Sequence, residues 1–362
     1  MTTIAFEGLT WDPGTSSWAD RCGFERATGS ADLIIQVVIG SEEVELPRGF
    51  AAAPQQLAES FVLERITGER IRVGANSGLG VRHALNAIRR GLQHGLWPDG
   101  SVQWPRFQHR GVIEGFYGPP WSHADRLGMV DFLSDHDFNL LVLAPKDEAS
   151  QRLDWRTPLD PHALVRLKEI VDRGISGGVD VASCVSPGLT IHYSSEADIE
   201  RCVDRLAQFA DLGMRHVGLL LDDIPWELQY DDDRAAFDSV AQAHASLATE
   251  VASRLWRRYP NLHLMVCPLV YCGIGDEPYI QLLGQSLHPR IDLMWTGREI
   301  CSHRLDLVDA ATFTRSAWRP PLYWDNYPVN DVAMVGELHL GPLQGRDRHL
   351  YRMSVGLVSN AM

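Results

Sequence analysis

Eight short apolar segments recur along the chain after Arg110, separated by stretches long enough to form helices. Their mean spacing of roughly 35 residues is typical of the alternating strands and helices of a (β/α)8 barrel. The segments span residues 111–116, 139–144, 179–186, 216–221, 262–267, 291–295, 322–324 and 355–359. The sequence therefore predicts an α/β protein built around a TIM barrel.

Nearly every one of these segments ends in residues that can take part in chemistry. They are Glu114, Gly115, Lys146, Ser186, Asp222, Asp223, Tyr271, Trp295, Thr296, Asp325, Asn326 and Asn360. Barrel enzymes place their active sites at the C-terminal ends of the strands. We therefore expect these residues to meet at one mouth of the barrel.

The first hundred residues have a different pattern and predict a separate small α+β domain. Strands are expected at 32–39, 59–66 and 69–73, followed by a helix that carries apolar residues at helical spacing. These apolar residues are Val81, Ala84, Leu85, Ile88 and Leu92. Gly78-Leu79-Gly80 matches half of a dinucleotide fingerprint, but the third glycine is absent, which favours a tight turn at a helix start.

We place the domains at residues 1–105 and 106–362. The chain stops just after the eighth segment, so the barrel is predicted to lack the helix that would cover it. The apolar residues 355–358 are then expected to be exposed, which favours association with a partner or a second copy.

Charge and composition exclude several classes of function. The net charge of −14, from 33 basic and 47 acidic residues, argues against nucleic acid or an anionic membrane as the main partner. The longest apolar runs, 140–145 and 217–221, are too short to span a bilayer. The N-terminus lacks the basic and apolar regions of a secretory signal, so a cytoplasmic location is expected.

Neither a metal nor a cofactor is predicted. The histidines form no ligand pattern at the strand ends, and the cysteines are scattered, so we expect Cys184 and Cys267 to be buried free thiols. The run Asp231-Asp232-Asp233 does not have the spacing of a calcium loop and is expected to be a solvated loop.

Asp222 and Asp223 form the most informative pair, because an apolar strand runs directly into two carboxylates. Adjacent residues of a regular strand point to opposite faces, so the pair can share a site only where the chain turns, and Pro225 supports a turn there. Of two close carboxylates, one can hold a proton while the other stays charged. One proton donor and one charged acceptor are what glycoside cleavage needs. The alternative is that one aspartate caps the next helix and the other faces solvent.

Tryptophans support a carbohydrate ligand, because sugars stack their C–H faces on aromatic rings. Five tryptophans follow predicted strands: Trp121, Trp155, Trp226, Trp295 and Trp324. Any one of them can instead belong to the core, and Trp324 at a strand end is the best candidate for a sugar platform.

A family resemblance emerges from eight motifs that occur in order from about residue 106 to the end. The motifs are Arg110-Gly-Val-Ile-Glu-Gly-Phe-Tyr-Gly-Pro-Pro-Trp121, Ala144-Pro-Lys-Asp147, Ser186-Pro-Gly188, Leu221-Asp-Asp-Ile224, Cys267-Pro-Leu-Val-Tyr-Cys-Gly273, Trp295-Thr-Gly297, Trp324-Asp-Asn326 and Val358-Ser-Asn360. Together they resemble glycoside hydrolase family 84, the O-GlcNAcases. The first hundred residues resemble the small domain that precedes the barrel in bacterial members.

The resemblance implies a retaining β-N-acetylglucosaminidase that uses the substrate's own acetamido group as nucleophile. Asp222 would orient the acetamido nitrogen, and Asp223 would be the general acid and then the base. Tyr271 would donate to the acetamido oxygen in a pocket walled by Trp324 and Asn326. The far side of the sugar would be held by Asp331, Lys146, Asn360 and the backbone of Gly115.

Other functions fit parts of the pattern. A hyaluronidase-like polysaccharide hydrolase is the closest alternative and is disfavoured by the acidic charge. A catalytically inactive sugar-binding barrel would lack one of the two carboxylates, and a metal-dependent hydrolase would need histidine ligands. The expected partner is a GlcNAc-bearing glycoprotein, glycopeptide or oligosaccharide, and the chain is a possible homodimer.

Overall fold

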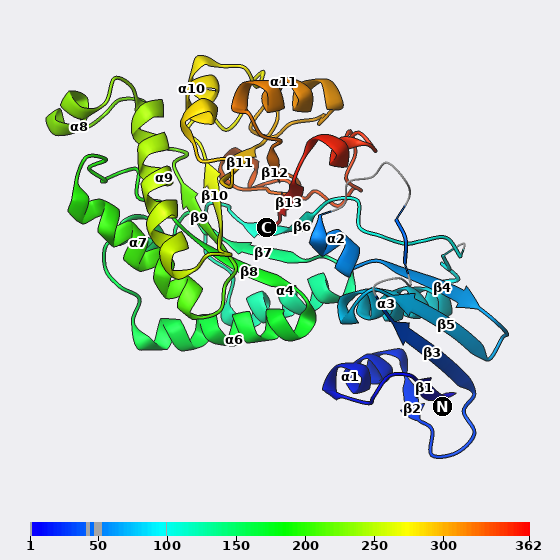
Figure 1. The fold of residues 1–362 in the computed structure, drawn as a ribbon. Coiled ribbons are helices and arrows are strands. Elements are labelled where there is room, and N and C mark those ends of the chain that lie inside the picture. Colours follow the sequence, from blue (N-terminus) through cyan, green and yellow to red (C-terminus); the bar gives the residue numbers. More distant parts are fainter. Residues whose placement is uncertain (1, 41–43, 47–52, 99) are drawn as a thin grey trace. The chain divides into compact units, whose positions relative to one another are not determined.

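The computed structural model describes residues 2–40, 44–46, 53–98 and 100–362, and the chain forms two compact units (Figure 1). One unit comprises Met1–Gln108 with Asp135–Asp137, and the other comprises His109–Ser134 with Phe138–Met362. Within the described residues, no helix combines the length and the apolar character needed to cross a membrane.

The first unit is a five-stranded sheet in the order β2-β1-β3-β5-β4 with three helices. The strands are β1 (Thr2–Glu7), β2 (Phe24–Arg26), β3 (Leu33–Ile39), β4 (Phe61–Arg65) and β5 (Arg70–Ala75), and the helices are α1 (Pro13–Cys22), α2 (Pro54–Ala58) and α3 (Gly78–His94). The sheet is parallel except for the β4–β5 pair. The prediction of three strands and a helix is confirmed for β3, β4, β5 and α3, whereas β1, β2 and α1 were not predicted.

Gly78 and Gly80 lie in the first turn of α3, so the predicted helix start is confirmed. Ser77 caps the helix by accepting a hydrogen bond from the amide of Leu79. A Cβ on Gly80 would lie 2.4 Å from the carbonyl oxygen of Ser60, so only glycine lets the helix pack this closely on the chain entering β4. Leu92 is exposed, while the other four apolar residues of the predicted helix face are buried.

The second unit is a closed parallel barrel in the order β6-β7-β8-β9-β10-β11-β12-β13, so the TIM-barrel prediction is confirmed. The strands are β6 (His109–Glu114), β7 (Leu140–Leu143), β8 (Asp180–Val185), β9 (His216–Leu220), β10 (His263–Cys267), β11 (Asp292–Trp295), β12 (Leu322–Asp325) and β13 (Gly356–Asn360). Each predicted segment matches one strand within a few residues at either end.

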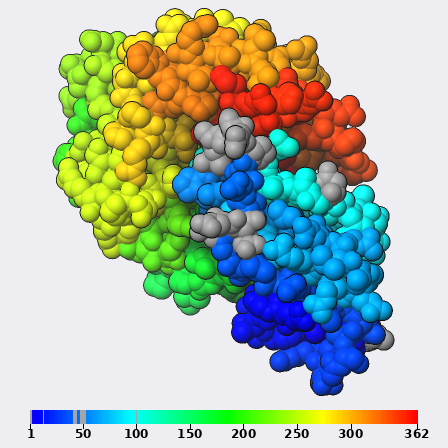
Figure 2. Space-filling view, turned by 45° about the vertical axis from the view of Figure 1, so that its right-hand side comes forward, coloured from blue at the N-terminus to red at the C-terminus, as the bar shows by residue number. Residues whose placement is uncertain are grey.

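Helices surround this barrel (Figure 1). They are α4 (His123–Asp135), α5 (Ala149–Arg152), α6 (Pro161–Gly177), α7 (Glu196–Asp211), α8 (Asp231–Ala236), α9 (Val240–Arg258), α10 (Pro278–Ser286) and α11 (Leu307–Ala317), with short 3-10 turns η1 (Val332–Met334) and η2 (Leu350–Met353). Alternate strand residues such as Val142, Cys184, Met265 and Val358 pack together in a single core cluster. Figure 2 shows the end of the chain, in red, at the surface beside the orange residues around α11.

Two expectations about this unit are wrong. Asp231–Asp233 is the first turn of α8 and not a loop. Asp231 and Asp232 are exposed as expected, but Asp233 is fully buried and accepts hydrogen bonds from the backbone of Tyr193 and Ser194 and from the Ser194 hydroxyl. The apolar residues of 355–358 are not exposed either. Val358 is fully buried in the barrel core and Val355 packs against it, while Leu357, on the opposite face of β13, is half-buried.

Three histidine rings lie at the N-terminal ends of β6, β9 and β10, away from the polar strand ends. His216 stacks on His263 with ring centroids 4.8 Å apart and meets His109 edge-on at 5.0 Å. Burial lowers the pKa of His109 and of His216 to about 3, and the neighbouring rings add to the effect. The folded protein therefore holds both rings neutral.

These histidines predict a loss of stability in mild acid. Below pH 6.5 the unfolded chain takes up protons on both rings, but the folded protein does not until about pH 3, so stability falls as the pH falls through this window. Each ring should lower the free energy of unfolding by about 2 kcal/mol between pH 7 and pH 5. Urea unfolding at the two pH values measures the difference, and His216→Gln should remove about 2 kcal/mol of it. An unchanged pH dependence in His216→Gln would contradict the assignment.

Candidate active site

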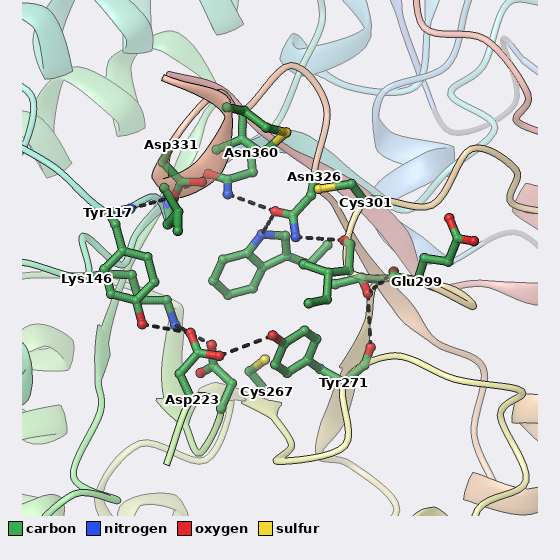
Figure 3. A pocket seen from close by; sticks show the side chains of 18 of the residues that line it. Tyr117, Lys146, Asp223, Cys267, Tyr271, Glu299, Cys301, Asn326, Asp331 and Asn360 are labelled. Atoms are coloured by element: carbon green, nitrogen blue, oxygen red, sulfur yellow. Dashed lines mark hydrogen bonds and ion pairs between the residues drawn. The ribbon is translucent and has the colours of Figure 1, made fainter. Parts of the chain in front are cut away.

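A cavity of about 1010 Å³ opens at the C-terminal ends of the barrel strands. It is lined by all nine residues to which the family resemblance gave a role: Gly115, Lys146, Asp222, Asp223, Tyr271, Trp324, Asn326, Asp331 and Asn360. Four strand-end residues that were also expected at the mouth do not line it: Glu114, Ser186, Trp295 and Asp325. Figure 3 shows how most of the lining side chains converge from different strand ends. The structure thus brings together residues that are up to 245 positions apart in the chain, such as Gly115 and Asn360.

The two adjacent carboxylates share the cavity because the strand has already ended. β9 stops at Leu220, and Asp223 adopts a φ of +53°, in the left-handed region that non-glycine residues seldom occupy. Asp222 is 4% exposed, whereas about 30% of the Asp223 side chain is accessible. One carboxylate is therefore enclosed and the other is open to the mouth.

Asp222 is held by a buried ion pair with Lys146, whose Nζ contacts Oδ2. Burial alone lowers the pKa of Lys146, but the charges of Asp222 and Asp223 outweigh it, so the net pKa is raised and the ammonium stays charged. The other oxygen of Asp222, Oδ1, has no hydrogen-bond partner within the described part of the chain. A buried acceptor without a partner is costly, so Oδ1 is available for a donor from a ligand.

The Asp223 carboxylate accepts hydrogen bonds from two tyrosine hydroxyls, as Figure 3 shows. Tyr117 donates to Oδ2 at 2.9 Å and Tyr271 donates to Oδ1 at 3.1 Å, while Lys146 Nζ lies 3.8 Å from Oδ2. Burial and then the nearby Asp223 raise the pKa of Tyr271, and burial also raises that of Tyr117. Both phenols are therefore protonated donors at neutral pH.

Arg152 on α5 supports this arrangement and was not predicted. Its Nη1 donates to the Tyr117 hydroxyl at 3.0 Å, and its Nη2 donates to the carbonyl oxygen of Asp223 at 3.0 Å. The guanidinium thus fixes both the left-handed backbone at Asp223 and the tyrosine that donates to its carboxylate. No strand-end signal marks Arg152, because it lies on the short helix α5 in the connection between β7 and α6.

The opposite wall is a hydrogen-bonded set built on strand ends. Trp324 Nε1 and Asn360 Nδ2 both donate to Asn326 Oδ1 at 2.9 Å, and the Gly115 amide donates to Asn360 Oδ1 at 3.1 Å. A Cβ on Gly115 would lie 2.2 Å from the Trp324 ring, so glycine is required for the indole to occupy this position. The Trp324 ring is thereby fixed as a flat face of the cavity.

The loop between β12 and β13 supplies the remaining wall. Asp331 Oδ2 accepts a hydrogen bond from the amide of Tyr117 at 2.7 Å. Thr296, which was expected at the mouth as a strand-end residue, also lines the cavity. Further lining residues that were not expected there are Tyr117, Cys267, Glu299, Ile300, Cys301, Val329, Val332, Ala333 and Met334. Tyr117 and Cys267 lie within the motifs that carry the family resemblance, whereas the four residues from Val329 to Met334 lie in the loop after β12, which no motif covers.

The cysteines and tryptophans that the sequence singled out differ in whether they lie in the core or line the cavity. All six cysteines are free, and burial raises the pKa of Cys267 well above its ordinary value, so it is a neutral thiol. Trp155 and Trp295 are fully buried and belong to the core, Trp226 is exposed, and only Trp324 of the five tryptophans lines the cavity. Within the described residues, no group of three or more His, Cys, Asp or Glu side chains could hold a metal ion.

Comparison with known proteins identifies the barrel. A family model described as β-N-acetylglucosaminidase matches residues 110–362, which is the whole of the barrel from β6 onward. This chain belongs to that family. The resemblance to glycoside hydrolase family 84 is thus confirmed, and the match does not include residues 1–109.

Individual proteins of the β-N-acetylglucosaminidase family are also similar to this chain in sequence and in structure. The proteins named Protein O-GlcNAcase from Rattus norvegicus and Mus musculus are each 30% identical over 256 residues, which is 69% of this chain and 27% of theirs. The chain therefore spans about a quarter of the length of these relatives. A solved mutant of the Thermobaculum terrenum O-GlcNAc hydrolase superposes with a TM-score of 0.70 at 36% identity, covering 71% of this chain and 56% of that one.

Proposed function

We propose that this chain is a retaining exo-β-N-acetylglucosaminidase that cleaves β-linked GlcNAc by substrate-assisted catalysis. The observation that carries the proposal is the pair of carboxylates in two different environments. Asp222 is enclosed, paired with Lys146 and left with one free oxygen, whereas Asp223 is accessible and receives two tyrosine hydroxyls. Such a division suits one enclosed acceptor for the acetamido N–H and one accessible carboxyl that can exchange a proton with the departing oxygen and with water.

The free oxygen of Asp222 would accept the N–H of the 2-acetamido group. This contact would turn the acetamide oxygen toward C1 of the sugar and stabilise the positive charge that develops as the oxazoline forms. Because the nucleophile belongs to the substrate, it attacks at a high effective molarity and no enzymic nucleophile is needed. Substrate-assisted families are known exceptions to the rule of two catalytic carboxylates.

Asp223 would protonate the departing oxygen and then deprotonate the water that opens the oxazoline. Its accessible position at the mouth supports this role. Tyr271 donates to Asp223 in the structure, so it would exchange this bond for one to the acetamide oxygen when substrate binds. Trp324 and Asn326 would enclose the acetyl methyl group, with their relative position fixed by the bond between them.

The far side of the sugar would meet Asp331, Asn360 and Lys146. Lys146 lies against Asp222, with Nζ 5.3 Å from the Trp324 ring, so its main contribution would be to hold Asp222 and its second a hydroxyl contact. The route uses neither a metal nor a cofactor. A glycoprotein, glycopeptide or oligosaccharide as the carrier of the GlcNAc, a cytoplasmic location and a homodimer all stay predictions.

The function is tested by measuring release of GlcNAc from a glycopeptide and from a chitooligosaccharide by the same preparation. We expect GlcNAc from at least one of the two, with β-anomer formed first because the mechanism retains configuration. Faster release from the glycopeptide would indicate a protein substrate. Release from neither, in a folded protein, would leave only an inactive sugar-binding barrel or a different polysaccharide as explanations and would refute the proposal.

The size of the acetyl pocket gives a second prediction. Lengthening the N-acyl chain of an aryl substrate from acetyl to propionyl and butyryl should lower kcat/KM stepwise, by about 10-fold or more for each methylene, because the pocket is already bounded by fixed side chains. The matching glucoside, which has no acetamide, should be inert because it lacks the nucleophile. Turnover of the glucoside at a comparable rate would remove the substrate-assisted mechanism altogether.

Arg152 gives a third prediction, because it supports Asp223 without reaching the substrate itself. Arg152→Met should lower kcat for a glycopeptide by about 10-fold or more while an activated aryl glycoside is less affected, since only the poor leaving group needs a well-placed acid. Tyr117→Phe should act in the same way, and the double variant should lose less than the product of the two factors because both act on Asp223. Equal losses on both substrates would show a merely structural role.

A further inference from the structure

Arg205 on α7 is a buried cation that has no counter-charge among the residues that the structure describes. The residue is 3% exposed, and its Nη2 donates to the carbonyl oxygen of Thr157. Its Nε and Nη1 have no hydrogen-bond partner within the described part of the chain. Burying a guanidinium without an anion is one of the most costly arrangements in a protein, and such a group calls for an explanation.

Arg319 shows how the same fold satisfies a buried guanidinium when nothing else is needed. It is 7% exposed, and its Nε, Nη1 and Nη2 all donate to backbone carbonyl oxygens. The acceptors are the carbonyls of Ala317, His288, Ile291, Gly284 and Leu287. Arg205 differs in that it lines a cavity, so its missing partners can come from outside the chain.

This second cavity has a volume of about 220 Å³ and lies on the outer face of the barrel. Ser183 of β8 and Leu143 of β7 line it, while their neighbours Ala182, Cys184 and Val142 point into the barrel core. Because side chains alternate along a strand, the cavity is separated from the candidate active site by the barrel wall. Residues of α6 and α7 close its other side.

The charges around this cavity are predominantly positive in a chain whose net charge is −14. Its basic side chains are His123, Arg126, Arg166 and Arg205, and its acidic side chain is Glu148. Two of the basic groups are neutralised, because Arg126 binds Glu114 at 2.7 and 2.9 Å and His123 contacts Glu169 at 2.8 Å.

Two arginines, Arg166 and Arg205, and one carboxylate, Glu148, remain among the charged side chains that line the cavity. Arg166 is exposed at the rim and Arg205 is buried at the base, while Glu148 accepts a hydrogen bond from the Ser150 hydroxyl at 3.2 Å. The buried hydroxyl of Ser183 adds a neutral donor. Guanidinium groups with a hydroxyl are the donor set that proteins use for oxyanions.

We propose that this cavity binds a tetrahedral oxyanion, phosphate or sulfate, either free or as the ester group of a small metabolite. The anion supplies the counter-charge that Arg205 lacks and accepts hydrogen bonds from the arginines and from Ser183. This site is independent of the glycosidase chemistry, so it stands or falls separately from the proposed function.

The test is thermal unfolding and calorimetric titration of the full chain with sodium phosphate, sodium sulfate and glucose 6-phosphate, against sodium chloride at matched ionic strength. Phosphate or sulfate at about 100 times Kd should raise Tm on the order of 4 °C, in a saturable way. Stronger binding of glucose 6-phosphate than of inorganic phosphate would identify an ester as the source. Stronger binding of inorganic phosphate would identify the free anion.

Variants separate a built site from general salt stabilisation, which sulfate produces with any protein. Arg205→Met should weaken binding by roughly 10–100-fold, the value of a charge-assisted hydrogen bond to a buried partner. Arg201→Met is the matched control, because Arg201 lies on the same helix and its exposed guanidinium only reaches Asp204 at 3.8 Å. Its Kd should equal that of the unmodified protein.

If Arg205→Met does not fold, Arg166→Met and Ser183→Ala carry the test, and each should weaken binding by several-fold. Two results would overturn the proposal. One is a Tm rise that is equal in the unmodified protein and in these variants, and the other is the absence of saturable heat with all three anions. Such a result would mean that Arg205 is satisfied by water in this cavity.

Discussion

Asp223→Ala is expected to cripple hydrolysis of a glycopeptide while largely sparing the first step on an activated aryl glycoside. A serine alkoxide is a strongly basic leaving group that must be protonated as it departs, whereas a nitrophenolate leaves unaided. General acid catalysis contributes typically about 10²–10⁴-fold, so the gap between the two substrates should be of that order. First-step rates measured by the burst of released aglycone give the comparison directly.

Asp222→Ala provides the contrast, because Asp222 is proposed to act on the acetamide. Its role does not depend on the leaving group, so both substrates should slow by similar factors. The structure supports this division, since Asp222 is enclosed by Lys146 and Asp223 is open to the mouth. A leaving-group dependence in Asp222→Ala and none in Asp223→Ala would reverse the two assignments.

Lys146→Met is expected to reduce both stability and activity, for one physical reason. It leaves the Asp222 carboxylate buried without its cation, because both side chains of this pair are almost fully enclosed. Breaking a buried pair from one side costs about 3–5 kcal/mol in the free energy of unfolding. Displacement of Asp222 from its position should also lower kcat/KM by about 10² or more. Urea unfolding and the aryl glycoside assay measure the two effects.

The double variant Lys146→Met/Asp222→Leu distinguishes stability from catalysis. Replacing both charges by apolar groups removes the uncompensated carboxylate, so most of the lost stability should return while activity does not. Lys168→Met is the matched surface control, because Lys168 pairs with Asp172 in an exposed position and should change the free energy of unfolding by less than about 1 kcal/mol. If Lys146→Met destabilises no more than this control, the pair is not a buried one in solution.

The positions of the barrel strands and of their chemically active ends could be read from the sequence. Each strand is a short apolar run, and hydrophobic periodicity is a local property that needs no knowledge of the remaining chain. The expectation that Gly115, Lys146 and Asn360 would meet followed from a general rule about barrels, and the structure places them around one cavity. The first unit was predicted less completely, because β2 has only three residues and β1 buries only Ile4.

Burial was harder to infer, because it depends on which residues approach from elsewhere. Asp233 was expected in solvent but is enclosed by the backbone of Tyr193 and Ser194, some 40 positions earlier. Trp295 lies at the end of β11 much as Trp324 lies at the end of β12, yet Trp295 packs in the core. The sequence position of an aromatic residue at a strand end does not say whether its ring points into the mouth or between helix and sheet.

What the sequence by itself determined was therefore the barrel, the order of its strands and the set of polar residues at their ends, because these depend on local periodicity and on motifs. What only the tertiary structure decided was how those residues are paired. Arg152 reaches Asp223 across 71 positions, and Lys146 binds Asp222 across 76. Such bonds form between side chains that the closed barrel brings together, and no local pattern in the chain encodes their geometry.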